Sequence, residues 1–516
     1  MTLSGFAMLS HQLHCGAIAT GDRPVLIRCA LQHPKGEARV LPHRSDKLKF
    51  EIPNRNDKEQ LMSNNPLQEN KMGIMPVGKL LANMALPMIL SMLVQALYNV
   101  VDSIYVSQIS ESAVTALSLA FPVQNMQIGF AVGIGVGVNA LLSKSLGENN
   151  AEAANKTAGN GVVLMLISTA IFMVFGVFGV RPYFEMQSTV VETVEGGIAY
   201  TSICCIFTLG VFVQVLMERL LQSTGRTVYT MYTQGLGAIV NIILDPILIH
   251  GWFGLPALGI AGAAWATVIG QWSGALLGLY LNFKHNPEVQ LSKRYLKPDS
   301  AIMTGILTVG IPSIIMNSIG SIMNFGMNQI LQGFTETATG VFGIYFKLQS
   351  FFFMPLFAIN GATISIIAFN YGARKPERIV KTLKISTFAA VCLLTAGFLA
   401  FQLVPQLLLN LFNPSAEFLQ LGIKALRIIS WSFPVAGVCI SLGACFQALG
   451  NGMYSTIVSI CRQLVVLLPA AYLLSLTGNV DNVWYSYPIA EVVSGITTLI
   501  LFLRIYRRKI KPLFQQ

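Results

Sequence analysis

The second half of the chain repeats the first at a constant offset of 225 residues. Pro87 pairs with Pro312 at this offset, Gly147 with Gly372, and Tyr229 with Tyr454. The register holds from Pro87 to Tyr229 without a gap, which a shared apolar composition alone does not produce. Sequence repeats of this length in an apolar chain are typical of two copies of one membrane bundle. We therefore expect the functional site to lie between the two copies.

The composition predicts an integral membrane protein built from helices. Hydrophobic residues make up 53% of the 516 residues and charged residues only 11%, against about 25% in ordinary soluble domains. The apolar runs reach about 20 residues, which is enough to cross a hydrocarbon core as a helix, whereas barrel strands alternate every second residue.

Twelve spans are predicted, six in each copy. They cover residues 80–105, 113–143, 161–180, 197–222, 229–250, 259–283, 302–331, 339–369, 385–409, 421–449, 454–476 and 483–506. Because six is even, both copies enter the membrane from the same side and are related as parallel repeats. The predicted fold is an all-α integral membrane protein with twelve transmembrane helices in two parallel six-helix repeats around a central cavity.

The domain organisation follows from these spans. We expect a disordered N-terminal extension over residues 1–75, an N-lobe over 76–284, a cytoplasmic linker over 285–300, and a C-lobe over 301–516 that ends in a basic tail. Residue Met62 precedes a short polar lead into the first span, so we interpret it as the natural start.

The basic residues set the orientation, because short loops rich in Lys and Arg stay in the cytoplasm. Nearly all the loop Lys and Arg residues fall on one side of the predicted membrane, and both termini of the bundle lie on that side. The net charge of +11 is therefore explained by topology, and we expect no nucleic-acid partner. The eight cysteines show no metal-binding spacing such as CxxC.

Two carboxylates lie well inside predicted spans of the first copy. Asp102 lies toward the outer end of the first span and Asp245 in the outer half of the fifth, so both sit at similar depth. Asn241 shares a helical face with Asp245, four residues away. Buried ionisable residues in a bilayer are functional candidates because they are costly to insert. Further candidates for the same site are Gln95, Tyr98, Asn99 and Thr267.

Carboxylate and amide oxygens form a hard-oxygen site. Such a site can hold Na⁺ at Asp102, Asn241 and Asp245, or it can hold a proton between the two carboxylates. At the 225-residue offset, Met327 stands for Asp102 and Ala470 for Asp245, so the acidic site is predicted in the N-lobe alone. A helix-capping role at the outer interface is the alternative for each aspartate.

Weaker candidates lie in the second copy. Lys347 replaces Pro122 of the first copy, and it either faces the central cavity or extends to the membrane surface. An adaptable apolar wall for substrates is predicted from residues Met316, Met323, Met327, Phe346, Phe351 and Met354, with Gln95 and Tyr98 of the first copy also facing the cavity. The ordinary composition of membrane helices is the alternative explanation for this wall. Glu491 and Arg462 are interpreted as a structural ion pair, and Pro87 as a hinge in the first span.

Several segments together resemble the multidrug and toxic compound extrusion (MATE) family, and most closely its bacterial MepA-type branch. They are ALPMILSMLVQALYNVVDSIYVSQI, SKSLGENNAEAANK, LLQSTGRT, NIILDP, GIAGAAWAT and FNYGARKPERI, and the resemblance covers about residues 76–510. It implies a two-lobed exporter driven by returning H⁺ or Na⁺. The family's first-lobe cation site would correspond to Asp102, Asn241, Asp245 and Thr267.

The resulting prediction is a cation-coupled multidrug antiporter of the inner (plasma) membrane. It would export amphipathic or cationic organic compounds by alternating access, as a monomer among membrane lipids and without a cofactor beyond the coupling ion. A lipid-linked oligosaccharide flippase is the alternative, although its pyrophosphate would need several cations in the cavity. An enzyme is not expected, because no segment assembles a nucleophile, a base and an orienting group.

Overall fold

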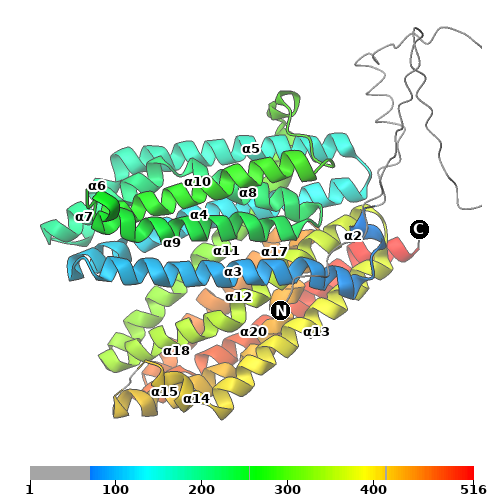
Figure 1. The fold of residues 1–516 in the computed structure, drawn as a ribbon. Helices are drawn as coiled ribbons and strands as arrows, with labels where there is room; N and C mark the ends of the chain where they lie inside the picture. The colour runs from blue at the N-terminus through cyan, green and yellow to red at the C-terminus, as the bar shows by residue number, and fades with distance from the viewer. Residues whose placement is uncertain (1–69, 255, 413–414, 516) are drawn as a thin grey trace, which may run out of the picture. The chain divides into compact units, whose positions relative to one another are not determined.

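The computed structural model describes residues 70–254, 256–412 and 415–515, and these residues form a bundle of helices (Figure 1). The expected disorder of residues 1–75 lies almost entirely outside the described residues. Its last part is corrected, because α2 (Lys71–Ile74) is helical and buries Met72. Asn70 caps this short helix by accepting a hydrogen bond from the Met72 amide.

The N-lobe consists of helices α3 to α10. Their bounds are α3 (Val77–Ser107), α4 (Glu111–Gly147), α5 (Ala151–Val174), α6 (Val180–Gln187), α7 (Val191–Ile206), α8 (Leu209–Ser223), α9 (Thr227–His250) and α10 (Ile260–His285). A π-helical turn, η1 (Phe175–Gly179), joins α5 to α6. The linker contains only the short 3₁₀ turn η3 (Lys293–Leu296).

The C-lobe consists of helices α11 to α20. Their bounds are α11 (Ser300–Gln332), α12 (Glu336–Gly372), α13 (Pro376–Leu403), α14 (Pro405–Asn410), α15 (Ala416–Ser430), α16 (Phe433–Ala448), α17 (Gly452–Ile460), α18 (Leu468–Ser475), α19 (Val480–Val483) and α20 (Ser486–Ile505). A π-helical segment, η4 (Cys461–Leu467), joins α17 to α18. Figure 1 shows α5 and α10 on one side of the bundle and α13 to α15 on the other.

Within the described residues, ten helices or continuous helical segments are long and apolar enough to cross a membrane, and two bent pairs bring the number to twelve. These pairs are α7 with α8 and α15 with α16, each bent by 47°. The predicted spans 197–222 and 421–449 correspond to these two bent pairs, whose bends were not predicted from the sequence. The breaks lie at 207–208 and 431–432, so they recur close to the repeat offset. The pattern of hydrophobic residues predicts which segments cross the membrane, but it does not predict where a helix bends.

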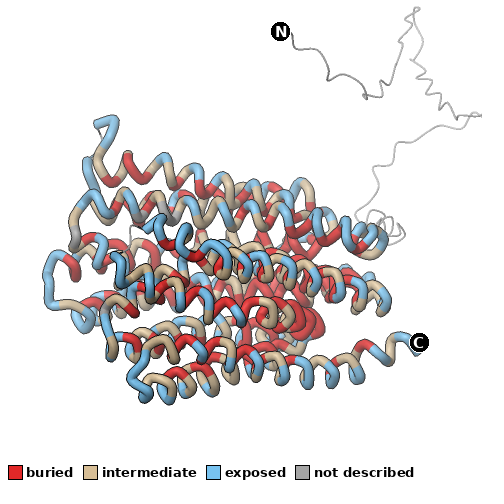
Figure 2. The backbone as a smooth tube through the Cα atoms, turned by 90° about the horizontal axis from the view of Figure 1, so that it is seen from below, coloured by how far each residue is buried: buried red, intermediate tan, exposed pale blue. Residues whose placement is uncertain are grey.

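Membrane-type burial is visible in Figure 2, where buried residues concentrate between the helices and exposed residues follow the outer faces. Large apolar side chains such as Leu86, Phe178 and Phe325 are exposed. An apolar exterior around a packed interior suits a protein that is surrounded by lipid.

Both lobes meet at the end of the bundle that carries α2 and the C-terminal residues, which we name the basic end (right in Figure 1). Here α4 packs against α11 and α12. A side chain at Gly147 would run into the Phe369 carbonyl, and one at Gly372 into the Lys144 carbonyl. Gly133 and Gly137 likewise face α11 without room for a side chain. Small residues at these positions let the two helices approach closely.

Pro87 lies inside the continuous helix α3. Because proline has no N–H, the carbonyl of Asn83, one turn earlier, loses its helical partner. The Thr227 hydroxyl on α9 lies 3.4 Å from that oxygen and donates to it. In the C-lobe, Pro312 stands at the same place in α11, and the Thr456 hydroxyl donates to its carbonyl at 2.9 Å. The helix α9 thus satisfies the carbonyl that Pro87 frees, whereas Thr456 donates to the carbonyl of Pro312 itself and not to the Thr308 carbonyl that Pro312 frees. The hinge role of Pro87 stays a prediction.

Candidate functional site

Asp102 and Asp245 come together in the N-lobe because α3 packs against α9. Asp102 is 9% exposed and Asp245 is fully buried. The two carboxylates are close enough for the charge of Asp102 to act on Asp245. Two acidic side chains that share a buried environment repel each other when both are ionised. The pair therefore favours a bound proton or a bound cation.

Asn241 connects Asp245 to a third helix. Its Nδ2 donates to Asp245 Oδ1 at 3.3 Å and lies 3.5 Å from Thr267 Oγ1 on α10. The sequence interval of four residues on α9 thus places Asn241 and Asp245 on one face, as predicted. Side chains from α3, α9 and α10 build one site, which we name the acidic cluster (Asp102, Asn241, Asp245 and Thr267).

Several oxygens of the acidic cluster lack a donor. Asp102 Oδ1, Asn241 Oδ1 and Asp245 Oδ2 are buried and accept no hydrogen bond from any other described residue. Such acceptors are costly when unsatisfied. Carboxylate, amide and hydroxyl oxygens suit a hard cation such as Na⁺, and the two carboxylates suit a proton. The described residues contain no group of three His, Cys, Asp or Glu that would suit a transition metal.

Tyr200 and Gln124 extend this polar region, and our sequence prediction missed both. Gln124 Nε2 on α4 donates to the Tyr200 hydroxyl at 2.9 Å. That hydroxyl also forms a side-chain hydrogen bond with Thr267, and Tyr200 is buried on α7. In the sequence, Gln124 and Tyr200 are each only a single polar residue within an apolar span, which is a weak signal for a functional site. Tyr200 lies in α7, seven residues before the bend into α8. The neighbours that its side chain meets therefore depend on a kink that the sequence did not reveal.

The other predicted neighbours lie on α3. Tyr98 is half-buried, and the charges of Asp102 and Asp245 act on it. Gln95 is also half-buried and forms a side-chain hydrogen bond with Tyr98. The structure does not describe the side chain of Asn99.

Several residues of the predicted substrate wall are packed inside the C-lobe. Met327 is fully buried and Met323 is 7% exposed, and both belong to a hydrophobic cluster with Tyr345 and Tyr487. The Tyr487 hydroxyl lies 3.8 Å from the Met323 sulfur. Phe346 is half-buried against this cluster. The structure thus corrects the expectation that Met323 and Met327 line a cavity, because helix packing in the C-lobe covers their side chains.

Lys347 on α12 is exposed and Met316 on α11 is half-buried, and their roles in substrate binding stay predictions. Arg462 Nη1 and Glu491 Oε2 lie 3.3 Å apart, and the predicted ion pair is confirmed. Two hollows of about 400 and 660 Å³ are lined by α13, α16 and α20. None of the predicted site residues lines either of them.

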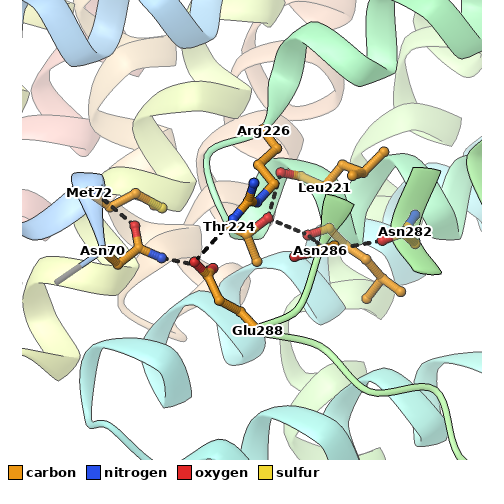
Figure 3. A network of polar contacts seen from close by, with 9 residues as sticks. Asn70, Met72, Leu221, Thr224, Arg226, Asn282, Asn286 and Glu288 are labelled. Carbon is orange, nitrogen blue, oxygen red and sulfur yellow. Dashed lines mark hydrogen bonds and ion pairs between the residues drawn. The ribbon is translucent and has the colours of Figure 1, made fainter. Parts of the chain in front are cut away.

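A polar network joins three segments at the basic end (Figure 3). Glu288, just after α10, accepts a hydrogen bond from Asn70 Nδ2 at 2.9 Å and pairs with Arg226 at 3.5 Å. Burial raises the pKa of the Glu288 carboxyl, although Arg226 and Lys71 act in the opposite direction. On the C-lobe side, Arg378 donates to the carbonyl oxygens of Met72 and Met75 at 2.9 and 2.8 Å. The α2 segment is thus tied to both lobes.

Comparisons with known proteins support the predicted resemblance to MATE transporters. The sequence profile of the MatE family matches residues 87–247 and 312–473, one stretch in each lobe. The chain is 27% identical to a FAD transporter from Shewanella oneidensis over 440 residues, which is 83% of this chain and 95% of that protein. It is 22% identical to the multidrug export protein MepA of Staphylococcus saprophyticus over 430 residues, or 82% and 93% of the two chains.

A solved structure agrees with the fold. A multidrug resistance MATE family transporter of the MOP superfamily, in its outward-facing conformation, superposes with a TM-score of 0.80 at 26% identity. The match covers 87% of this chain and 99% of that one. The family profile covers more than half of the chain, in two stretches spaced by the repeat offset. The chain therefore belongs to the MatE family of multidrug and toxic compound extrusion transporters.

Proposed function

We propose that this protein is a multidrug antiporter of the inner membrane, with both termini in the cytoplasm. It exchanges inward-moving H⁺ or Na⁺ for amphipathic or cationic organic compounds. Support comes from relatives such as the multidrug export protein MepA and from the apolar outer faces of the helices. The acidic cluster is the single observation that carries the proposal, because it places unsatisfied oxygens of two carboxylates in one lobe.

In this mechanism the transporter alternates between forms that open at opposite ends. In the form described here the lobes are closely packed at the basic end, which the distribution of Lys and Arg assigns to the cytoplasm. The acidic cluster takes up a cation from the outside, and the loss of negative charge weakens the binding of a cationic compound. Asn241 and Thr267 hold the Asp245 carboxylate in position during this exchange.

The driving force is sufficient for export. One pH unit supplies about 1.4 kcal/mol per proton, and a membrane potential of 100 mV supplies about 2.3 kcal/mol per charge. Because about 1.4 kcal/mol corresponds to a tenfold change in an equilibrium constant, one or two cations per cycle support roughly tenfold to thousandfold accumulation.

Purified protein in lipid vesicles tests the proposal. Ethidium uptake is measured under a pH gradient and, separately, under a sodium gradient. We expect one gradient to drive uptake in the unmodified protein, and Asp102→Asn and Asp245→Asn to abolish that response while the protein remains folded. Glu185→Gln, an exposed carboxylate on α6, is the control. Gradient-driven uptake by both aspartate variants at the unmodified rate would contradict the mechanism.

A second cargo deserves the same assay. The relative from Shewanella oneidensis is described as a FAD transporter, so we include FAD beside ethidium. A dinucleotide carries negative charge, and the exposed Lys347 is a C-lobe cation outside the described ion pairs that could attract it. Transport of FAD with loss in Lys347→Met would favour the nucleotide, and transport of ethidium alone would favour the cationic compounds.

A further inference from the structure

A third buried carboxylate of the N-lobe lies outside the acidic cluster. Glu218 on α8 is 5% exposed, and it forms no ion pair with any Lys, Arg or His in the described residues. Its neighbour Arg219 acts on it only through its field, since the Arg219 guanidinium donates to Gln222 Oε1 at 2.8 Å. Glu218 thus contrasts with Glu491, which Arg462 neutralises directly.

Neutral side chains surround Glu218. Gln214 Nε2 and Thr233 Oγ1 contact Oε1 at 3.2 and 3.0 Å, and Gln234 Nε2 contacts Oε2 at 2.8 Å. We name these three residues the Glu218 shell. The helices α4, α5 and α10 also pack on α8, and among their described residues no charged side chain acts on Glu218.

The Glu218 shell can satisfy both the ionised and the protonated carboxyl. The Thr233 hydroxyl has a second acceptor, the Thr230 carbonyl at 2.9 Å, and its single proton can serve only one of the two oxygens at a time. Gln234 Oε1 is buried and has no partner among the described residues. Rotation of this amide would exchange its nitrogen and oxygen, so that a protonated Glu218 donates to the oxygen. A glutamate that stays ionised would not require partners that can switch between donating and accepting a hydrogen bond.

A proton suits this site better than a metal ion does. Two of the three shell contacts are amide N–H groups that point at the carboxylate. In this orientation the groups would repel Na⁺, and rotation of Gln234 would add only one oxygen, whereas Na⁺ needs several around it.

The repeat shows that the C-lobe has lost this whole arrangement. At the 225-residue offset, Glu218 corresponds to Gly443, Gln214 to Cys439, Thr233 to Val458, and Gln234 to Ser459. The acidic cluster is lost in the same way at Met327 and Ala470. Helix packing alone would not require a buried carboxylate with two amide partners in one lobe and none in the other, so this shared asymmetry links Glu218 to the acidic cluster.

The position of Glu218 completes the argument. Gln234 of the Glu218 shell and Asn241 of the acidic cluster lie on the same helix, α9, seven residues apart. Seven residues of α-helix span about 10 Å. Since α9 begins at the basic end, Glu218 lies between that end and the acidic cluster.

We propose that Glu218 is a second proton-binding site, through which the coupling proton passes from the acidic cluster toward the basic end. This inference rests on the proposed function, and it names the proton as the coupling ion. Glu218 carries a proton in one part of the transport cycle and is ionised in another, while the Glu218 shell rearranges its hydrogen bonds.

Glu218→Gln tests this inference in lipid vesicles, which are empty for uptake and loaded with ethidium for exchange. Glutamine is chosen because it preserves the size and hydrogen bonding of a protonated glutamate. Two rates are measured: uptake driven by a pH gradient, and exchange of ethidium without any gradient. We expect Glu218→Gln to keep exchange within about twofold and to lose at least tenfold in gradient-driven accumulation. Glu152→Gln, an exposed carboxylate on α5, should match the unmodified protein in both assays. Unchanged accumulation in Glu218→Gln would overturn the proposal, as would an equal loss of both rates, which indicates a purely structural role.

A second pair of variants covers the case in which Glu218→Gln does not fold. Thr233→Val and Gln214→Leu keep the carboxylate and remove one contact each. We expect both to displace the pH profile of transport, and identical profiles would contradict the inference. Failure of the proposed function is distinguishable, because the unmodified protein would then respond to neither gradient or Asp102→Asn would transport normally. A response of the unmodified protein to sodium alone would refute the Glu218 site and leave the proposed function intact.

Discussion

The oxygens of the acidic cluster outnumber the donors that reach them, and this imbalance decides the chemistry of the site. Asn241 supplies one amide group to both Asp245 and Thr267, while three neighbouring oxygens receive no hydrogen bond from a described residue. Asn241, which contacts both Asp245 and Thr267, is placed to orient the Asp245 carboxylate.

Removal of the Thr267 hydroxyl should weaken the binding of the coupling ion to the acidic cluster. Thr267→Val has nearly the same shape, but it leaves the Asn241 amide without its second contact. We expect the concentration of H⁺ or Na⁺ that gives half-maximal transport to rise about threefold to tenfold, or about 0.7 to 1.4 kcal/mol, with the maximal rate preserved. The measurement is ethidium transport as a function of cation concentration, with Thr267→Ser as the matched control. An unchanged requirement in Thr267→Val would remove Thr267 from the site.

Glu288 should make the stability of the protein depend on pH. Burial raises the pKa of this carboxyl above its ordinary value, so its contribution to stability is complete at low pH and is lost as pH rises through the folded pKa. Glu288→Gln does not ionise and should lose less stability between pH 5 and pH 8. We expect the melting temperature of the variant relative to the unmodified protein to rise by about 1 to 2 °C over this range. Thermal unfolding in detergent measures it, and a constant difference would show that Arg226 fully compensates the burial.

At the scale of the helices, the repeat explains what the sequence predicts well. One register places α4 and α12 over matching residues, 111–147 and 336–372, and it also reveals which acids the C-lobe lacks. The same comparison would have revealed Glu218, since Gly443 is its counterpart, but Glu218 lies close to the end of the predicted span 197–222 and was not among the predicted site residues. The bends within the fourth and tenth spans, and the partners of Tyr200 that depend on them, require packing information that hydrophobicity does not contain.

The contact between α4 and α12 at the basic end should tolerate no side chain. Gly372→Ala would place a methyl group against the Lys144 carbonyl, a backbone atom that cannot yield easily. Gly343 lies in the same helix and has open space around it, so Gly343→Ala is the matched control. Alanine in a helix is otherwise favoured over glycine by about 0.5 to 1 kcal/mol. We expect Gly343→Ala to maintain or raise the melting temperature and Gly372→Ala to lower it. Equal effects would show that the lobes do not depend on this contact.

At the scale of the whole molecule, the two lobes have related folds and different chemistry. The N-lobe carries the acidic cluster and Glu218, whereas the C-lobe fills the corresponding core with Met323, Met327 and aromatic rings. The predicted division between the lobes follows from the repeat. The repeat does not predict how the lobes pack against each other. The glycines that join the lobes can be recognised as contact residues only when the partner helix is known.

Alternating access requires the basic end to open during transport, and this can be measured directly. Glu152 on α5 and Glu377 on α13 are exposed and lie at the start of helices that begin at the basic end, one in each lobe. Spin labels at Glu152→Cys and Glu377→Cys, with the native cysteines replaced, report the separation of the lobes by electron paramagnetic resonance. We expect one short distance in the form described here and a second, longer distance when the pH, sodium or ethidium is varied. The Asp102→Asn background should suppress the change caused by the coupling ion, since that ion acts through the acidic cluster. A single distance under all these conditions, in protein that transports ethidium, would show that the lobes move in some other way.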